Sequence, residues 1–110
     1  MDNLKIYQKS LLLVKEIYRL IKIDLALTKD YSLCDQLKRS TISVASNIAE
    51  GYCRTNKQFK NYLQIASGST NEVVTLLKIV FLVYGIDTIY FQEQYKYLGK
   101  QINSFSNKLI

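Results

Sequence analysis

The chain contains no proline and only four glycines in 110 residues. Sheet proteins of this size use more proline and glycine at their turns, whereas long helices need few turns. A chain of this length also suffices for one domain with a single buried core. The sequence therefore predicts one all-α domain that spans residues 1–110.

Apolar residues recur at alternating steps of four and three in four segments, which is the spacing of an amphipathic helix. The predicted helices cover residues 3–27, 33–51 and 56–84 and the segment that follows Asp87 as its N-cap. Short connections between long helices imply antiparallel neighbours, so we expect an up-down four-helix bundle. The expected core stripe of the first helix consists of Tyr7, Leu11, Val14, Tyr18, Ile21 and Leu25.

Turn and cap residues predict where the helices end. Ser32 is the expected N-cap of the second helix, which is expected to stop at Gly51 or shortly after, because glycine tolerates the left-handed conformation that often ends a helix. Thr55 and Gln58 have the spacing of a capping box at the start of the third helix. Gly85 is expected to end that third helix.

Positive charge is the main functional signal, because fifteen Lys and Arg residues outnumber nine Asp and Glu residues, for a net charge of +6. This excess favours RNA or DNA as a partner, bound through phosphates, although lysines also serve to keep a bundle soluble. The candidate contacts lie on the outer face of the first helix and in a segment without acidic residues: Lys5, Lys9, Lys15, Arg19, Lys22, Arg54, Lys57 and Lys60.

Histidine is absent, which removes the commonest general base and the commonest metal ligand. Between Gln36 and Glu72 the only carboxylates are Glu50 and Glu72 itself, and no metal-ligand set or phosphate loop accompanies them. The sequence therefore predicts a protein that is not an enzyme and that uses no metal, cofactor or small-molecule substrate.

Cys34 and Cys53 are expected near opposite ends of one helix, about 28 Å apart, which is beyond the reach of a disulfide. Reduced cysteines suit a cytoplasmic protein. No membrane association is expected, since the most apolar run, "VVTLLKIVFLVYGI", is short for a membrane span and contains Lys78.

A polar stripe runs beside the apolar stripe of the second predicted helix. Short Ser and Asn side chains are poor helix formers when exposed, so this stripe is expected to pack against another polar surface. That surface belongs either to a neighbouring helix or to another subunit, and an ordinary solvent-facing surface is the alternative. The stripe consists of Gln36, Ser40, Ser43, Asn47 and Glu50.

The third predicted helix carries a matching region, "IASGSTNE". Gly68 in its middle costs about 1 kcal/mol relative to alanine, so we expect it to mark close packing, with Ser69 on the same side. If the second and third helices fold back at Arg54, Arg39 and Glu72 lie about 4.5 Å out of level. This small offset along the bundle axis is within reach of the two side chains, so we expect an ion pair between Arg39 and Glu72.

Two blocks, "QLKRSTISVASNIAEG" and "FKNYLQIASGSTNE", resemble the four-helix-bundle family that is encoded by intervening sequences within bacterial 23S rRNA genes. Members of that family are often labelled ribosomal proteins. The chain departs from the pattern at Ala45, where many members have proline, and at Ser40, where many have alanine. The matching residues are Gln36, Arg39, Ser43, Asn47, Ile48, Ala49, Glu50, Gly51, Phe59, Tyr62, Leu63, Ala66, Gly68, Ser69 and Glu72.

The resemblance implies a left-handed antiparallel bundle and a ring-shaped homo-oligomer, with pentamers in structurally related proteins. It extends to the accessory proteins of diversity-generating retroelements, which are basic, and it implies association with nucleic acid and a reverse transcriptase. It implies no established enzymatic activity. A protein-interaction scaffold remains the alternative, because Tyr52, Tyr90 and Tyr97 fall outside the apolar stripes and exposed tyrosine is common at interfaces.

Overall fold

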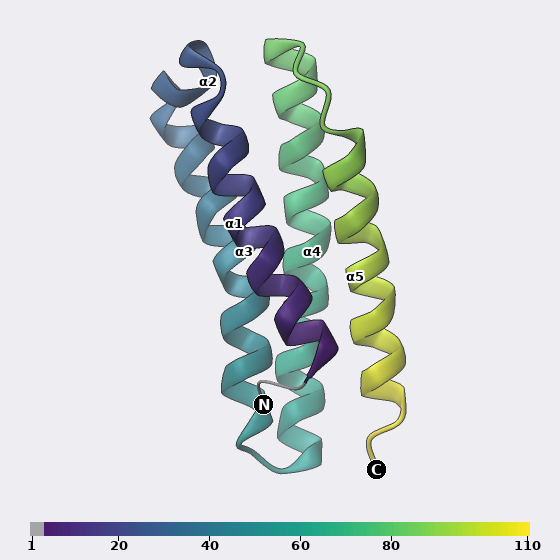
Figure 1. The fold of residues 1–110 in the computed structure, drawn as a ribbon. Helices are drawn as coiled ribbons and strands as arrows, with labels where there is room; N and C mark the ends of the chain where they lie inside the picture. Colours follow the sequence, from purple (N-terminus) through teal and green to yellow (C-terminus); the bar gives the residue numbers. More distant parts are fainter. Residues whose placement is uncertain (1–3) are drawn as a thin grey trace.

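The computed structural model describes residues 4–110, which form an antiparallel up-down bundle of four long helices (Figure 1). This arrangement confirms the expected fold class. A short fifth helix, which was not predicted, lies at the end of the bundle opposite the chain termini. The helices are α1 (Lys5–Lys22), α2 (Leu25–Lys29), α3 (Tyr31–Tyr52), α4 (Asn56–Tyr84) and α5 (Ile89–Asn107).

The first predicted helix is interrupted at Ile23 and Asp24, so the prediction of one continuous helix is wrong. Asp24 adopts an extended backbone conformation, and its side chain accepts a hydrogen bond from the N–H of Leu27, as an N-cap does. The hydroxyl of Thr28 reaches back to the carbonyl of Ile21 at 2.6 Å. The break turns Leu27 into the core, where it is fully buried.

The core face of α1 also differs from the predicted stripe. Leu11 is 46% exposed, and Leu25, beyond the break, is 70% exposed. The helix has two neighbouring apolar stripes, and periodicity alone does not decide which of them faces the other helices. The stripe that is buried consists of Ile6, Leu13, Ile17, Leu20 and Ile21.

Two predicted N-caps are wrong and one capping box is confirmed. Asp30 caps α3 in place of Ser32, because its carboxylate accepts from the N–H of Leu33. Thr88 occupies the N-cap position of α5, one residue later than the predicted Asp87, although the Asp87 carboxylate accepts from the N–H of Ile89. Both hydrogen bonds of the Thr55–Gln58 box are present, and α4 begins and ends as predicted.

Three glycines have different structural roles. Gly85 ends α4 with a φ of 68°, as predicted. Gly51 instead lies inside α3 and is buried; a Cβ atom there would lie 2.6 Å from the Cβ of Tyr62 on α4. Close approach of the two helices, and not a left-handed turn, is therefore the reason for this glycine. Gly68 was predicted to pack closely, but it is exposed, and an added Cβ would meet nothing within 4 Å.

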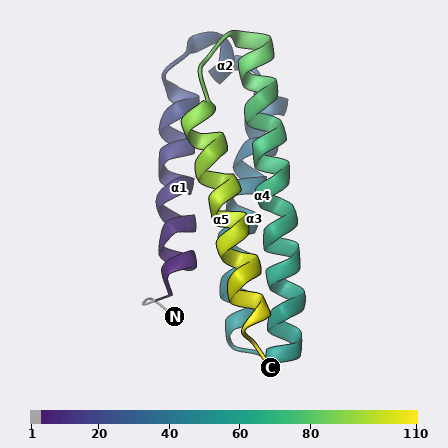
Figure 2. The same ribbon diagram turned by 90° about the vertical axis from the view of Figure 1, so that its right-hand side faces the viewer.

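Helices α3 and α4 form the most extensive pair, and α1 and α5 cover them (Figures 1 and 2). Phe81 is 48% exposed near the end of α4. The two cysteines form no disulfide, as expected: Cys34 is buried and Cys53 is exposed. The central core side chains are Leu37, Val44 and Ile48 from α3, Leu63, Val73 and Leu77 from α4, and Tyr95, Leu98 and Ile102 from α5.

Within the described residues, α4 is the one helix whose length and composition would allow it to cross a membrane. This is weak evidence for a membrane span, because the central helix of a bundle meets the same criteria. Helices α3 and α5 both pack along α4 in the structure.

The two glycines give opposite predictions for stability. Gly51→Ala should lower the free energy of unfolding by about 1–3 kcal/mol, because its methyl group overlaps Tyr62. Gly68→Ala should raise it by about 1 kcal/mol, because alanine is the better helix former and space is available. Urea unfolding followed by circular dichroism measures both. A neutral Gly51→Ala variant would contradict the close approach of α3 and α4.

Asp30 and Tyr84 make the stability depend on pH at both extremes. The Tyr84 hydroxyl donates to the second carboxylate oxygen of Asp30 at 2.6 Å. This bond and the N–H of Leu33 lower the pKa of Asp30, and the same bond raises the pKa of Tyr84. The Asp30 contribution is full above its ordinary pKa of 3.8 and is lost as pH falls through the lower folded value. The Tyr84 contribution is full below 10.0 and is lost as pH rises through the higher folded value.

Tyr84→Phe should therefore flatten the alkaline decline and weaken the acid decline, which the Leu33 hydrogen bond partly retains. Urea unfolding across the pH range measures this effect. An unchanged profile in the variant would show that the hydrogen bond contributes nothing.

Candidate nucleic-acid interface

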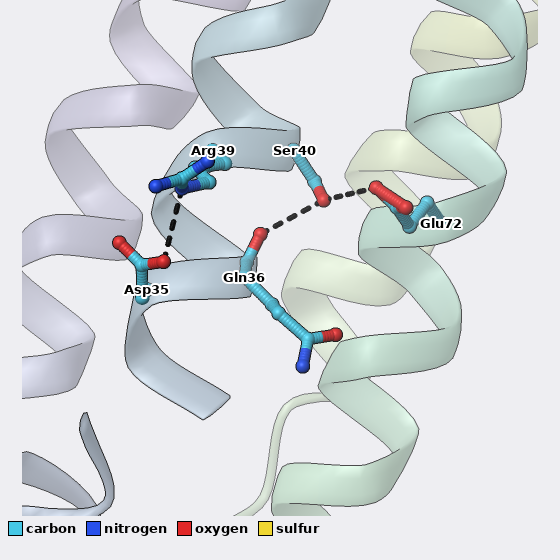
Figure 3. A network of polar contacts seen from close by, with 5 residues as sticks. All are labelled: Asp35, Gln36, Arg39, Ser40 and Glu72. Atoms are coloured by element: carbon cyan, nitrogen blue, oxygen red, sulfur yellow. Dashed lines mark hydrogen bonds and ion pairs between the residues drawn. The ribbon is translucent and has the colours of Figure 1, made fainter. Parts of the chain in front are cut away.

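The polar stripe of α3 faces α4 in the same chain at Ser40 and Ser43. The Ser40 hydroxyl lies within hydrogen-bond distance of the Gln36 carbonyl and of the Glu72 carboxylate (Figure 3). A hydroxyl has one proton to donate, and a carboxylate is the stronger acceptor, so the bond to Glu72 dominates. Ser40 itself is buried. This contact joins α3 to α4 at the rim of the core.

The predicted ion pair between Arg39 and Glu72 is wrong. Arg39 pairs with Asp35 at 2.9 Å on its own helix, and its side chain is 81% exposed (Figure 3). The predicted position of the two residues along the bundle axis was nearly correct, but the predicted direction of the Arg39 side chain was not. Each residue step turns a side chain by about 100° around the helix axis. Ser40, one position later, is therefore the residue that reaches Glu72.

A second polar contact between α3 and α4 lies closer to the α3–α4 turn and, with the Ser40–Glu72 contact, forms a polar seam between the two helices. The hydroxyl groups of Ser43 and Ser69 lie 2.8 Å apart, one on each helix. The Asn47 amide donates to the carbonyl of Ser43 at 2.8 Å and lies 3.0 Å from its hydroxyl. Of the two partners left open by the sequence, the neighbouring helix is the one that the structure gives to these serines. Ser40 with Glu72 and Ser43 with Ser69 thus hold the two helices in register, whereas Asn47 bonds within α3.

The predicted basic cluster at the α3–α4 turn divides into paired and unpaired charges. Arg54 forms an ion pair with Glu50, and this hydrogen bond raises the pKa of Arg54. Its guanidinium group also lies 5.5 Å from the centre of the Tyr62 ring. Lys57 is exposed and Lys60 is half-buried, and neither forms an ion pair within residues 4–110. These two lysines carry the free charge of this end.

The five predicted basic residues of α1 do not form one surface. Lys22 lines a pocket between α1, α2 and α3, whereas Lys5 lines a groove on the α5 side. Lys9 lies over the ring of Tyr97 on α5, 4.4 Å from the ring centre, and partial burial lowers its pKa. Lys15 and Arg19 are exposed. The predicted single basic face is therefore spread over two flanks and the outer side of α1.

Helix α5 supplies basic residues that the sequence interpretation missed. Lys100 and Lys108 line the same groove as Lys5, together with Tyr97, which is 57% exposed. Tyr52 and Tyr90 are exposed as well, as the tyrosine pattern predicted. A signal for α5 was present in the sequence, because no Asp or Glu follows Glu93.

Across residues 4–110, no group of Cys, Asp or Glu side chains is placed to hold a metal ion. Glu50 forms an ion pair with Arg54, and the Glu72 carboxylate accepts a hydrogen bond from the Ser40 hydroxyl. The residues of the two sequence blocks thus hold the fold together, and exposed lysines with tyrosines are the features available for binding.

Fold and surface together define a small basic protein of the up-down helical-bundle class. The chain belongs to the family described as 23S rRNA-intervening sequence protein, whose model matches residues 2–110. None of the curated proteins compared with the chain matches it. It is similar to a protein of unknown function of the S23 ribosomal protein family from Bacteroides thetaiotaomicron, solved by crystallography. The two are 23% identical, the match covers 94% of this chain and 96% of that one, and the TM-score is 0.83. At this identity the likeness supports the fold alone.

Proposed function

We propose that this protein is a non-enzymatic, oligomeric protein that associates with RNA through phosphate contacts. One observation carries the proposal: within residues 4–110, only three of the fifteen Lys and Arg side chains form ion pairs. The net charge of +6 attracts polyanions over long range, and the unpaired side chains are available to bind phosphates. The paired residues are Arg39, Arg54 and Lys96.

The exposed cations predict binding without base recognition. Lysine side chains such as Lys15 and Lys57 contact phosphates as point charges, which fixes position but reads no sequence. Such binding weakens steeply as salt rises, because counterions must be released from the nucleic acid. The description of the family makes fragments of 23S rRNA a suitable first probe. The two free cysteines support a reducing compartment such as the cytoplasm.

A shallow apolar groove between α1 and α3 supports the oligomeric part of the proposal. Leu11 is 46% exposed and Ile42 is 45% exposed, and both line this groove. The other lining side chains are mostly apolar or small: Tyr7, Val14, Ala45, Ser46 and Ala49. A second copy would cover these residues, and a ring, pentameric as the family resemblance implies, would repeat each basic surface and strengthen binding by avidity.

A protein-interaction scaffold is the second candidate function, and a separate surface favours it. At the end of the bundle that holds α2, large apolar side chains are exposed on three segments. Contiguous exposed apolar surface commonly marks a protein interface. Contacts of this kind would persist at salt concentrations that remove RNA. The exposed residues are Ile23, Leu25, Leu82, Val83, Ile89 and Tyr90.

RNA binding is tested by titrating labelled fragments of 23S rRNA with the protein at low and at physiological salt. The affinity should fall by about tenfold or more between these conditions. Lys57→Glu combined with Lys60→Glu should weaken it further at either salt, since two attractive charges become repulsive. Absence of binding at low salt would overturn the RNA proposal and favour the scaffold.

Light scattering of the purified protein tests oligomerisation, and the expected mass is a multiple of the 12.8 kDa chain. Leu11→Glu should shift the mass toward one chain, because it places a charge in the α1–α3 groove. Ile65→Glu is the matched control, since Ile65 is 51% exposed on α4 and lies outside both that groove and the apolar surface near α2. A wild-type protein with the mass of one chain would contradict the oligomer.

A further inference from the structure

The outer side of α5 carries a basic, aromatic trough whose tyrosine and lysines lie outside both sequence blocks. Two hollows of about 370 and 360 Å³ flank Tyr97 and Lys100, which line both. The first is closed on its other side by Lys5 and Ile6 of α1, and the second by residues of α4. Figure 2 shows α5 running between α1 and α4, so the two hollows lie on the two sides of α5 and meet at Tyr97 and Lys100.

We infer that this trough binds single-stranded RNA, with a base stacked on Tyr97 and with phosphates bound by Lys5, Lys100 and Lys108. The inference rests on the proposed association with RNA and adds the surface and the strandedness. Three features occur together in this trough: the exposed ring of Tyr97, lysines without ion pairs on both the α1 side and the α5 side, and hollows large enough for a nucleotide.

The charge of the trough is almost unopposed. Lys5, Lys9, Lys100 and Lys108 form no ion pair with any carboxylate of residues 4–110; Lys96 does, with Glu93 at 3.6 Å. Lys5 also lies in the first turn of α1, where the helix dipole is positive and an acidic residue would be more stabilising. That placement adds to the positive potential at the point where α1 meets the end of α5.

Tyr97 is held where a base could stack on it. The Lys9 ammonium lies over one face of the ring, 4.4 Å from its centre, which fixes the ring between the two helices. More than half of the side chain is nevertheless exposed, at 57%. Stacking on an aromatic ring accepts any base, so this contact agrees with binding that reads no sequence.

Gln101 adds a hydrogen-bond acceptor beside the ring. It lines the hollow with Lys5, and its Oε1 atom is covered and has no hydrogen-bond partner among the described residues. An unsatisfied buried acceptor destabilises a protein, and a turn of the amide toward the amino group of a base would relieve that cost.

The shape favours a single strand over a duplex. Each hollow has the volume of a small-molecule site, enough for one or two nucleotides, whereas a duplex is far wider. Bases in a duplex already stack on one another and present no free face to Tyr97. An acidic peptide is the other ligand that the lysines could attract, but it would leave the tyrosine and the glutamine without a role.

The test compares a labelled oligoadenylate of about 12 nucleotides, its duplex with oligouridylate, and an oligoglutamate peptide of equal charge. Two variants have matched controls. Tyr97→Ala is compared with Tyr90→Ala, since Tyr90 is 60% exposed on the same helix outside the trough. Lys5→Gln with Lys100→Gln is compared with Lys29→Gln with Lys78→Gln, which gives the same net charge. Circular dichroism confirms that each variant is folded.

The single strand should bind more tightly than the duplex or the peptide. Tyr97→Ala should weaken single-strand binding by about tenfold and Tyr90→Ala by less than about twofold. Salt dependence is the slope of the logarithm of the binding constant against the logarithm of the salt concentration. Lys5→Gln with Lys100→Gln should reduce this slope by about one unit more than Lys29→Gln with Lys78→Gln. Single-strand binding that responds equally to variant and control would overturn the inference and leave the proposed RNA association intact. Binding of the oligoglutamate peptide as tight as that of the single strand would also overturn the inference. Absence of RNA binding by the unchanged protein would overturn both the inference and the proposed RNA association.

Discussion

The close antiparallel packing of α3 on α4 is the contact on which the rest of the structure depends. Gly51 has no side chain to separate the helices, so Tyr62 approaches to a distance that no other residue would tolerate. The Thr55–Gln58 capping box starts α4 immediately after α3 ends. Ser40 with Glu72 and Ser43 with Ser69 then fix the register farther along the pair. Polar contacts of this kind specify one register more than they add net stability.

The other helices pack on this pair, and their arrangement leaves the surfaces that we propose to bind RNA. Helix α1 is shorter than α4 because Asp24 ends its run, and it packs more extensively on α3 than on α5. The weaker contact with α5 leaves space for the groove at Lys5 and Tyr97. Lys5 of α1 and Lys100 of α5 both line this groove and repel one another across it, which is consistent with an open groove between the two helices. Structure and charge therefore point to the same face of the molecule.

Local rules predicted the features that local residues decide. The Thr55–Gln58 box, the bounds of α4 and the left-handed Gly85 each depend on hydrogen bonds or torsion angles within a few residues. The break at Asp24 was missed because apolar spacing continues across it. The core side of α1 was also missed, because two apolar stripes compete and only packing selects one.

The candidate site was less predictable for the same physical reason. The Arg39–Glu72 prediction was one residue away from the observed Ser40–Glu72 contact, since axial level does not give the rotation of a helix. The groove combines the start of α1 with the end of α5, about ninety residues apart, and no sequence spacing records that neighbourhood. The family blocks direct attention to α3 and α4, whose marked polar residues prove to be structural.

The central proposal is that α3 and α4 build the fold while α1 and α5 present the main surface that binds RNA, to which Lys57 and Lys60 at the α3–α4 turn add positive charge. The most direct measurement is a titration of isotope-labelled protein with a single-stranded oligonucleotide, followed by amide chemical shifts. The account predicts that the largest shifts occur at Lys5, Tyr97, Lys100 and Gln101, with the seam at Ser40 and Ser43 nearly unchanged. Shifts concentrated on the α3–α4 turn, or no shifts at all, would contradict it.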